Sequence, residues 1–417
     1  MTTEELKKYK KILILGYGKE GHSVERFLKM NVPTAEICIA DKKDDENYLL
    51  KQKDVDLVVR SPGVRVEQVF QKWTTAANIF FSNFPGTIVG ITGTKGKSTT
   101  ASLVAALLKQ NKPDVRLIGN IGNPMLDGLI DATKETIAVI ELSSYQLADL
   151  YFSPHITIIV NWYPEHLDFH GTFDAYKKAK QNSIYFQTEK DYFIFDPHET
   201  EVAGWEGLTK AKGIPYTEEY PFEQSKIPLL GNHNKRNIQG ALTVARLFGV
   251  TDEQAQAAIY SFIPLPHRLQ NIGTYNGITF YDDAISTTPE STMAALNSIE
   301  HIDTILLGGQ DRGYDFKRLV EVLKEKKIEN IVLFPQTGFQ IKQLLLKMED
   351  YYPTYLETDN MKDAVSFCFE NSKKGSVCLL STASPSYSLW KNFEEKGDLF
   401  QTFVRDYGGA STSVKKE

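Results

Sequence analysis

One glycine-rich segment constrains the fold of this chain more than any other part of the sequence. A β-branched run at 87–92 leads into Gly93-Thr94-Lys95-Gly96-Lys97-Ser98-Thr99, an order that predicts a buried strand, a tight turn and then a helix. The glycines let backbone N–H groups approach phosphate, while Lys97 offers a positive charge and Ser98 a hydroxyl for Mg²⁺. Ile91 stands where the general phosphate-loop pattern has its first glycine. The segment predicts a nucleoside-triphosphate site in an α/β fold, and the alternative is an ordinary glycine turn.

Length, charge and cysteine usage narrow the class of protein. A chain of 417 residues has room for about three domains with substantial cores. The net charge of −6 and the dispersed lysines argue against a nucleic-acid partner, and no run approaches the ~20 apolar residues of a membrane span. The cysteines, Cys38, Cys368 and Cys378, lie in apolar runs without metal-ligand spacing, which favours reduced core residues. We expect a cytoplasmic monomer that binds small molecules and has no nucleic-acid or membrane partner.

Short apolar runs alternate with amphipathic segments along the whole chain, which predicts parallel sheets covered by helices. Three such blocks follow one another, and we predict domains at 1–86, 87–264 and 265–417. A linker is expected at 81–86, a hinge at Pro264-Leu265-Pro266, and a polar, frayed tail after Gly408. Strands are expected at 11–15, 37–41, 56–59, 87–92, 137–142, 156–161, 278–281, 304–307, 330–334 and 376–380. Helices are expected around 24–28, 176–186 and 233–248.

The first block carries a second glycine motif. Gly16-Tyr17-Gly18-Lys19-Glu20-Gly21 follows the first expected strand, and Asp41 comes about 20 residues later, as in dinucleotide-binding units. Taken alone, this motif suggests NAD and an oxidoreductase.

Further polar groups follow the expected strands, where open α/β sheets place their ligands. Glu141 ends a strand and suits Mg²⁺, although a surface acid is the plain alternative. His166 and Asp168 follow another strand, and a lone histidine is more often structural. Asn234 and Asn237 open a helix, where we expect exposed amides. In the last block, an arginine and several acids at strand ends suit planar oxyanions of a nucleotide: His267, Arg268, Asp282, Asp283 and Arg312.

Taken in chain order, these motifs resemble the Mur ligase family of ATP-dependent amide-bond-forming enzymes. The resemblance rests on the phosphate loop and four later motifs that follow it in the family's order: Glu141-Leu142-Ser143-Ser144, His166-Leu167-Asp168, His233-Asn234 with Asn237, and His267-Arg268. It covers most of the chain. It implies a Rossmann-like N-terminal domain, a central P-loop domain and a C-terminal Rossmann-like domain, hinged so that they close around the substrates.

Two features are similar to the branch of the family that adds D-glutamate to UDP-N-acetylmuramoyl-L-alanine, a step of peptidoglycan precursor synthesis. One is Gly16-x-Gly18 with Ser61-Pro62-Gly63, and the other is the segment 380–397. Ile285 and Arg312 each stand where that branch usually has lysine. The alternatives are L-glutamate as the acceptor, the branch that adds diaminopimelate or lysine, and a nucleotide-binding protein without catalysis. The segment 168–176 resembles the diaminopimelate branch, but its Asp-Asn-Pro-Arg motif is absent.

The resemblance also implies a role for each matching position. The UDP substrate would be held by Gly16, Tyr17, Gly18, Asp41, Lys42, Ser61, Gly63 and Asn120. ATP would be held by Gly93, Thr94, Lys95, Gly96, Lys97, Ser98, Thr99, Asn234, Asn237, Arg268 and Asp283. Two Mg²⁺ ions would be held by Ser98, Glu141, His166 and Lys180, the last carbamylated by CO₂. Glutamate would be held by Thr287, Arg312, Ser381 and Trp390. Catalysis would rest on Lys97, Lys180, His166 and Glu141. Without the resemblance, Lys180 would be interpreted as a solvated helix residue.

Overall fold

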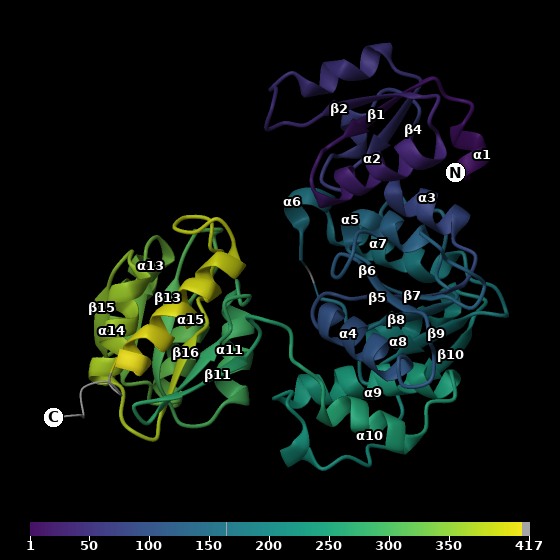
Figure 1. Cartoon of the computed structure of the whole chain (residues 1–417). Coiled ribbons are helices and arrows are strands. Elements are labelled where there is room, and N and C mark those ends of the chain that lie inside the picture. The colour runs from purple at the N-terminus through teal and green to yellow at the C-terminus, as the bar shows by residue number, and fades with distance from the viewer. Residues whose placement is uncertain (164, 411–417) are drawn as a thin grey trace. The chain divides into compact units, whose positions relative to one another are not determined.

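The computed structural model describes residues 1–163 and 165–410, which form two compact units. Unit 1 comprises residues 1–227 with 233–262, and unit 2 comprises 228–232 with the described chain from 263 onward. Figure 1 shows unit 1 in purple to teal and most of unit 2 in green to yellow. The boundary between the units lies next to the expected hinge at 264–266, and the three domain boundaries themselves stay a prediction.

Unit 1 begins with a small parallel sheet. Its strands β1 (Lys11–Leu15), β2 (Glu36–Ala40), β3 (Leu57–Arg60) and β4 (Trp73–Thr75) lie in the order β2-β1-β3-β4. The helices of this part are α1 (Thr3–Leu6), α2 (Lys19–Asn31) and α3 (Ala76–Asn83). Strand β1 lies between β2 and β3 and is buried from Ile12 to Leu15. The first glycine motif follows its carboxyl end and is therefore held at a fixed edge of the sheet.

The second sheet of unit 1 carries the phosphate loop on a central strand. Its order is β10-β9-β8-β5-β7-β6, and every pair is parallel. The strands are β5 (Thr87–Thr92), β6 (Val115–Gly119), β7 (Ile137–Glu141), β8 (Ile156–Ile159), β9 (Tyr192–Phe195) and β10 (Lys212–Pro215). The helices are α4 (Lys97–Leu108), α5 (Ser144–Leu147), α6 (Leu167–His170), α7 (Phe173–Tyr185), α8 (Thr200–Ala203), α9 (Asn232–Leu247) and α10 (Asp252–Tyr260).

The two sheets of unit 1 share one hydrophobic core. Buried side chains of β1, α3 and β7, including Ile14, Phe80 and Ile140, belong to a single cluster. Polar contacts reinforce it, since Arg26 pairs with Asp127 at 2.7 Å. This shared core explains why the two sheets form one compact unit, and it fixes the edges of both sheets relative to each other.

Unit 2 contains a six-stranded sheet in the order β11-β12-β16-β13-β14-β15. All neighbouring strands are parallel except β11 and β12, which form an antiparallel hairpin. The strands are β11 (Gln270–Tyr275), β12 (Ile278–Asp282), β13 (Ile302–Gly308), β14 (Asn330–Phe334), β15 (Thr354–Glu357) and β16 (Val377–Leu380). The helices are α11 (Pro289–Ser298), α12 (Lys317–Glu325), α13 (Thr337–Leu345), α14 (Met361–Asn371) and α15 (Phe393–Ala410).

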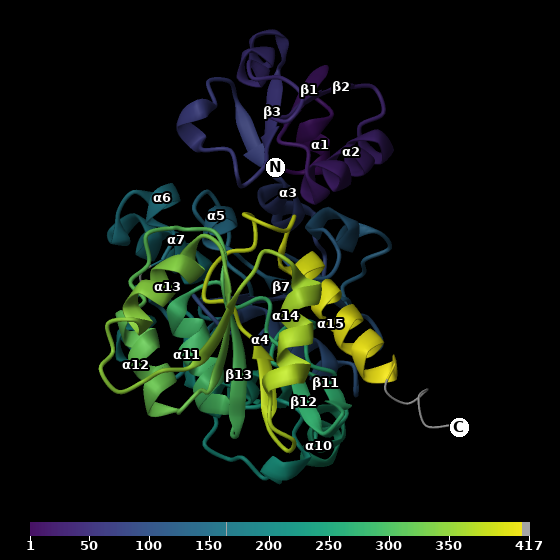
Figure 2. The same ribbon diagram turned by 90° about the vertical axis from the view of Figure 1, so that its left-hand side faces the viewer.

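Alternating side chains of the central strands fill both faces of this sheet. Ile305 and Leu307 pack with α11, α12 and α13, whereas Leu306 packs with α14 and α15. Figure 2 shows these two groups of helices on opposite sides of β13. Burial on both faces accounts for the continuous apolar runs that the sequence shows here.

The expected fold class is confirmed as α/β with mainly parallel sheets, and the expected strands and helices are all present with small shifts at their ends. Within the linker expected at 81–86, residues 81–83 are helical, because α3 extends to Asn83. The tail prediction was wrong for residues 409 and 410, which continue α15, and residues 411–417 lie outside the described part. All three cysteines are free, and Cys38 is half-buried rather than in the core.

Within the described ranges, no helix combines the length and apolar character needed to cross a lipid bilayer.

Candidate active site

The phosphate loop joins the end of β5 to the start of α4. Gly93 and Gly96 have φ angles of 145° and 81°, backbone conformations that residues other than glycine rarely adopt. A Cβ atom on Gly96 would lie 2.6 Å from Oδ1 of Asn237. The loop therefore depends on glycine at both positions. The first turn of α4 has no intrahelical acceptors for its N–H groups, so this end of the helix suits an anion.

The loop is held by a side chain that the sequence analysis did not single out. Asn161 Oδ1 accepts hydrogen bonds from the backbone N–H groups of Thr94 (3.1 Å) and Lys95 (2.9 Å). Lys95 also pairs with Glu165 at 2.6 Å. Asn161 and Glu165 were missed because the residues that they contact lie more than sixty positions away in the sequence. Their position just after the strand β8 was the available signal.

Lys180 is buried against the loop. Its side chain is 1% exposed, and its Nζ donates a hydrogen bond to the carbonyl oxygen of Gly93 at 2.7 Å. Burial and the nearby Lys97 lower the pKa of Lys180 well below its usual value. The interpretation of Lys180 as a solvated residue was therefore wrong. A buried lysine of lowered pKa is a neutral amine for part of the time, and a neutral amine is a nucleophile.

Glu141 supplies a buried carboxylate at the end of β7. It is 1% exposed, and its Oε1 accepts a hydrogen bond from Asn120 Nδ2 at 3.0 Å. Its Oε2 has no hydrogen-bond partner among the described residues. Burying an unpartnered carboxylate oxygen is costly unless a cation compensates it. The geometry at Glu141 thus fits a bound metal ion.

His166 lies in a loop after β8, at the same edge of the sheet as Glu141. Its φ angle is 57°, and its Nδ1 lies 3.3 Å from the hydroxyl of Tyr145. Burial lowers the pKa of His166, which favours the neutral imidazole that binds metal ions. The described residues contain no group of three or more His, Cys, Asp or Glu side chains suited to a metal. Mg²⁺ in phosphate sites commonly has only one or two protein carboxylates as ligands, so this arrangement fits.

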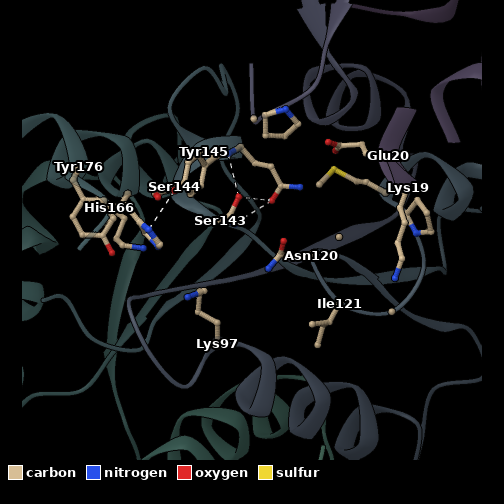
Figure 3. Close-up of a pocket in the computed structure, with 18 residues that line it drawn as sticks. Lys19, Glu20, Lys97, Asn120, Ile121, Ser143, Ser144, Tyr145, His166 and Tyr176 are labelled. Atoms are coloured by element: carbon tan, nitrogen blue, oxygen red, sulfur yellow. Dashed lines mark hydrogen bonds between the residues drawn. The ribbon is translucent and has the colours of Figure 1, made fainter. Parts of the chain in front are cut away.

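A pocket of about 740 Å³ extends from the phosphate loop to the first sheet of unit 1. Figure 3 shows His166 and Tyr176 at one end, Lys19 and Glu20 at the other, and Asn120 and Lys97 between them. Its lining also includes Pro62, Gly63, Ser143, Gln146 and Lys180. The pocket therefore brings residues from both glycine motifs into one cavity.

The first glycine motif is stabilised by two polar side chains. Asp41 accepts hydrogen bonds from the backbone N–H groups of Lys43 (2.9 Å) and Tyr17 (2.5 Å), and these bonds lower its pKa. Ser61 Oγ donates to the carbonyl oxygen of Gly16 at 2.7 Å. Both residues therefore shape the loop, while Lys42 is exposed beside it.

Comparison with known proteins identifies the family. Residues 91–225 match the Mur ligase middle domain, and residues 267–383 match the Mur ligase glutamate ligase domain. The chain is 33% identical to the UDP-N-acetylmuramoylalanine–D-glutamate ligase of Streptococcus suis, covering 96% of this chain and 98% of that protein. It is 32% identical to the protein of the same name from Halalkalibacterium halodurans, covering 95% and 97%. The chain belongs to the Mur ligase family.

Solved structures agree on the fold. The Mur ligase chain superposes on the UDP-N-acetylmuramate–alanine ligase MurC of Thermotoga maritima with a TM-score of 0.64 at 17% identity, over 96% of this chain and all of that one. The MurF ligase of the same organism, solved in complex with ADP, gives 0.61 at 17% identity over 95% of each chain. As a Mur ligase, the chain is an ATP-dependent amide-bond-forming enzyme, and the three-domain fold expected from the sequence is confirmed.

Unit 1 of this Mur ligase brings many of the predicted residues together. The pocket contains Gly63, Lys97, Asn120, His166 and Lys180. The expectation of exposed amides at the start of α9 was wrong, since Asn234 and Asn237 are 6% and 3% exposed. Asn237 Nδ2 donates to Asn234 Oδ1 at 2.9 Å, and Asn237 Oδ1 accepts from Thr100 at 3.3 Å. Asn237 therefore lies against the phosphate loop and α4, since its Oδ1 is also the atom that a Cβ on Gly96 would meet. The side chain of Asp168 lies outside the described residues.

The remaining predicted residues lie in unit 2 of the Mur ligase. Ser381 is fully buried, and its Oγ donates to Asp283 Oδ2 at 2.8 Å. Burial raises the pKa of Asp283 to about 6. The rings of Trp390 and Phe334 pack edge to face, with their centres 5.0 Å apart. Arg312 is exposed and Thr287 half-buried, and Arg268 is half-buried after His267. Their roles toward ATP and glutamate stay predictions.

Lys19, Glu20 and Gln146 line the Mur ligase pocket although the sequence analysis assigned them no role. Burial raises the pKa of Glu20 to about 7, and Gln146 is its hydrogen-bond partner. Lys19 and Glu20 lie within the first glycine motif, so their position in the sequence could have indicated a place in the pocket. Gln146 could not be found in this way, because its approach to Glu20 depends on how the two sheets pack.

Proposed function

We propose that the chain joins D-glutamate to UDP-N-acetylmuramoyl-L-alanine at the expense of ATP, in the cytoplasmic synthesis of peptidoglycan precursors. The observation that carries this proposal is the likeness, over 96% of the chain, to a ligase named for D-glutamate and UDP-N-acetylmuramoylalanine. The match to the glutamate ligase domain at 267–383 supports the same acceptor.

The pocket of unit 1 is the proposed site of the UDP substrate. Its volume of about 740 Å³ suits a ligand larger than a nucleotide alone. The UDP end would contact the glycine motif of β1, and the carboxylate end would reach Lys97 near the phosphate loop. Asn120 lies between these two ends (Figure 3). The first domain would then bind a UDP-sugar rather than NAD.

ATP would bind with its phosphates at the loop Gly93–Thr99. Ser98, Glu141 and His166 would hold Mg²⁺, which supplies charge neutralisation for the phosphates when bound. Lys97 would contact the β- and γ-phosphate oxygens as a point charge. Its Nζ already lies close to the loop, 2.8 Å from the carbonyl oxygen of Thr94.

Lys180 is the proposed site of carbamylation. The neutral Nζ amine would attack CO₂, forming a C–N bond and releasing one proton, so that a neutral buried amine becomes a carbamate anion. The burial of Lys180 beside Gly93 supports this, because an anion here would compensate Lys97 and bound Mg²⁺. The carbamate oxygens would then add ligands that the protein carboxylates do not supply.

The reaction would proceed in two steps. A carboxylate oxygen of the L-alanyl group attacks the γ-phosphorus of ATP, and the bond from that phosphorus to the β,γ-bridging oxygen breaks, giving an acyl phosphate and ADP. The glutamate amine then attacks the acyl carbon, phosphate leaves, and one proton is lost. The protein would contribute position and charge: the pocket orients the carboxylate, and Lys97 stabilises the transferring phosphoryl group.

The test is to supply the enzyme with ATP, Mg²⁺, UDP-N-acetylmuramoyl-L-alanine and either enantiomer of glutamate, and to identify the product by mass spectrometry. Ligation of D-glutamate supports the proposal. Preference for L-glutamate would replace D-glutamate as the acceptor, and ligation of neither enantiomer would favour another branch of the family. Sedimentation of the active protein tests whether it is a monomer, as we further propose.

A further inference from the structure

Lys396 is a fully buried lysine in unit 2 that the proposed reaction does not use. It lies on α15 with 0% of its side chain exposed. Its Nζ donates a hydrogen bond to Oγ1 of Thr382 at 2.5 Å and lies 5.9 Å from the ring centre of Trp390. Burying a lysine costs free energy unless partners compensate its charge. Its position therefore calls for a physical reason.

Carboxylates at the end of β12 supply the compensating charge. Asp282 and Asp283 both act on Lys396 electrostatically. Asp282 is itself shared, since its Oδ2 lies 2.7 Å from Nδ1 of His267 and accepts a hydrogen bond from Gln401 at 2.8 Å. From the same helix as Lys396, Asp398 and Glu394 face His267. Lys396 and Gln401 thus bring α15 into a buried polar cluster under the strand ends.

Thr382, the hydrogen-bond partner of Lys396, connects neighbouring strand-end segments. Its carbonyl oxygen accepts from the N–H of Gly308 at 2.8 Å, and its hydroxyl lies 3.0 Å from the carbonyl oxygen of Ser384. Further along the same two segments, the N–H of Gln310 donates to the carbonyl oxygen of Pro385 at 2.8 Å. The segment at 381–386 is therefore tied to the one that leads to Arg312.

We propose that Lys396 is a positioning residue for the glutamate site. Its ammonium donates to Thr382 and is attracted electrostatically to Asp282 and Asp283 at the end of β12. It would thereby fix the strand-end segments that carry Thr287, Arg312 and Ser381. This inference rests on the proposed function, because those residues are the proposed glutamate contacts. Lys396 acts through these neighbours and does not touch the substrate.

The charge of Lys396 gives this role a measurable signature. Burial lowers its pKa to about 7, against the opposing effect of Asp282 and Asp283. Below that pH the ammonium holds its partners, and above it the neutral amine loses its attraction to the carboxylates. The KM for glutamate should therefore rise as the pH increases through about 7, beyond the change caused by titration of the glutamate amine itself.

Two variants test the inference, with Lys391→Met as a control at an exposed lysine of the same region. Lys396→Arg keeps a charge that does not titrate in this range, so the ratio of its glutamate KM to that of the wild type should fall with increasing pH. Lys396→Met should raise the glutamate KM about tenfold at pH 6, the scale of one lost charge-assisted hydrogen bond. Its KM for the UDP substrate should stay within about twofold.

Thermal unfolding and hydrogen exchange of β12 in unit 2 establish that each variant is folded. The inference is overturned if Lys396→Met retains the wild-type glutamate KM, if the KM for the UDP substrate rises together with that for glutamate, or if the Arg variant keeps the wild-type pH profile. If the Arg variant does not fold, the glutamate KM of the wild type and of Lys396→Met, measured against pH, tests the inference without it. The Met variant should lack the rise in glutamate KM that the wild type shows above about pH 7. Failure of the wild type to ligate glutamate would instead refute the proposed function.

Discussion

Lys180 Nζ lies 2.7 Å from the carbonyl oxygen of Gly93, so a lysine of α7 contacts the first glycine of the phosphate loop. The contact spans 87 positions of the chain and places a buried, reactive amine beside the proposed phosphate site. An unmodified lysine here adds positive charge next to Lys97, whereas its carbamate adds negative charge.

Replacing Lys180 by Ala should therefore reduce ligation by about a hundredfold or more, the scale of a lost preorganised charge at the reacting group. Acetate should restore part of the rate, because it can supply a carboxylate in the vacated space. A ¹³C carbamate signal from ¹³CO₂ should be seen in the wild type and be absent from the variant. Lys178→Ala, at an exposed lysine of the same helix, should behave as wild type. A carbamate-free wild type of full activity would contradict the assignment.

Replacing Lys97 by Ala should lower ADP formation by about a hundredfold or more, since a positioned cation at the transferring phosphoryl group contributes several kcal/mol. The measurement is initial rate in a coupled ADP assay. The matched control is Lys109→Ala at the exposed C-terminal end of α4. Near wild-type turnover in the Lys97 variant would show that the loop binds phosphate without this lysine.

Replacing Glu141 by Gln should raise the Mg²⁺ concentration for half-maximal rate by about tenfold or more, because the buried Oε2 loses its charge. Gln keeps an oxygen that can accept from Asn120, so the effect reports the charge rather than the packing. Glu135→Gln changes an exposed carboxylate just before the same strand and serves as control. An unchanged Mg²⁺ dependence would remove Glu141 from the metal site.

Replacing Arg312 by Ala should weaken the use of glutamate by about 2–3 kcal/mol in kcat/KM, because a guanidinium can bind a carboxylate through two hydrogen bonds. The KM for ATP should change little. Arg318→Ala, at an exposed arginine that pairs with Glu321, controls for the loss of surface charge. If only the KM for ATP rises, Arg312 belongs to the nucleotide site.

The stability of unit 2 should depend on pH through His267. Its hydrogen bond to Asp282 raises its pKa above 6.5, so the folded state binds a proton more tightly than the unfolded state. This contribution is fully present below about pH 6.5 and is lost as the pH rises through the raised folded-state value. Hydrogen exchange of β12 should show protection falling over that range in the wild type more than in His267→Gln. Equal pH dependence of both proteins would contradict this.

Much of the fold follows from apolar runs alone, because strands such as β5 and β14 are buried on both faces and read as continuous hydrophobic segments. Two of the strands that were missed, β10 and β15, lie at sheet edges and carry a weaker signal. β10 ends in Pro215 and contains Gly213, and β15 is exposed or half-buried at every position. Edge strands of this kind are defined by the neighbour with which they pair.

The candidate site could be predicted only where local sequence determines local structure. The phosphate loop depends on glycines within a few positions, so it was recognised at once. Lys180 and Asn234 could not be interpreted correctly from their own residue types, because both are polar side chains buried by segments distant in the chain. Lys396 was missed for the same reason, since its partners lie on β12 and after β16.

Transfer of ¹⁸O from substrate to phosphate distinguishes ATP-driven ligation of D-glutamate through an acyl phosphate from other routes. The substrate is UDP-N-acetylmuramoyl-L-alanine labelled with ¹⁸O in its L-alanyl carboxylate, supplied with ATP and D-glutamate. The released phosphate should carry one ¹⁸O atom for each molecule of amide product, because the attacking carboxylate oxygen leaves with the phosphoryl group. Unlabelled phosphate accompanying the D-glutamyl product, or labelled phosphate with L-glutamate but not with D-glutamate, would contradict it.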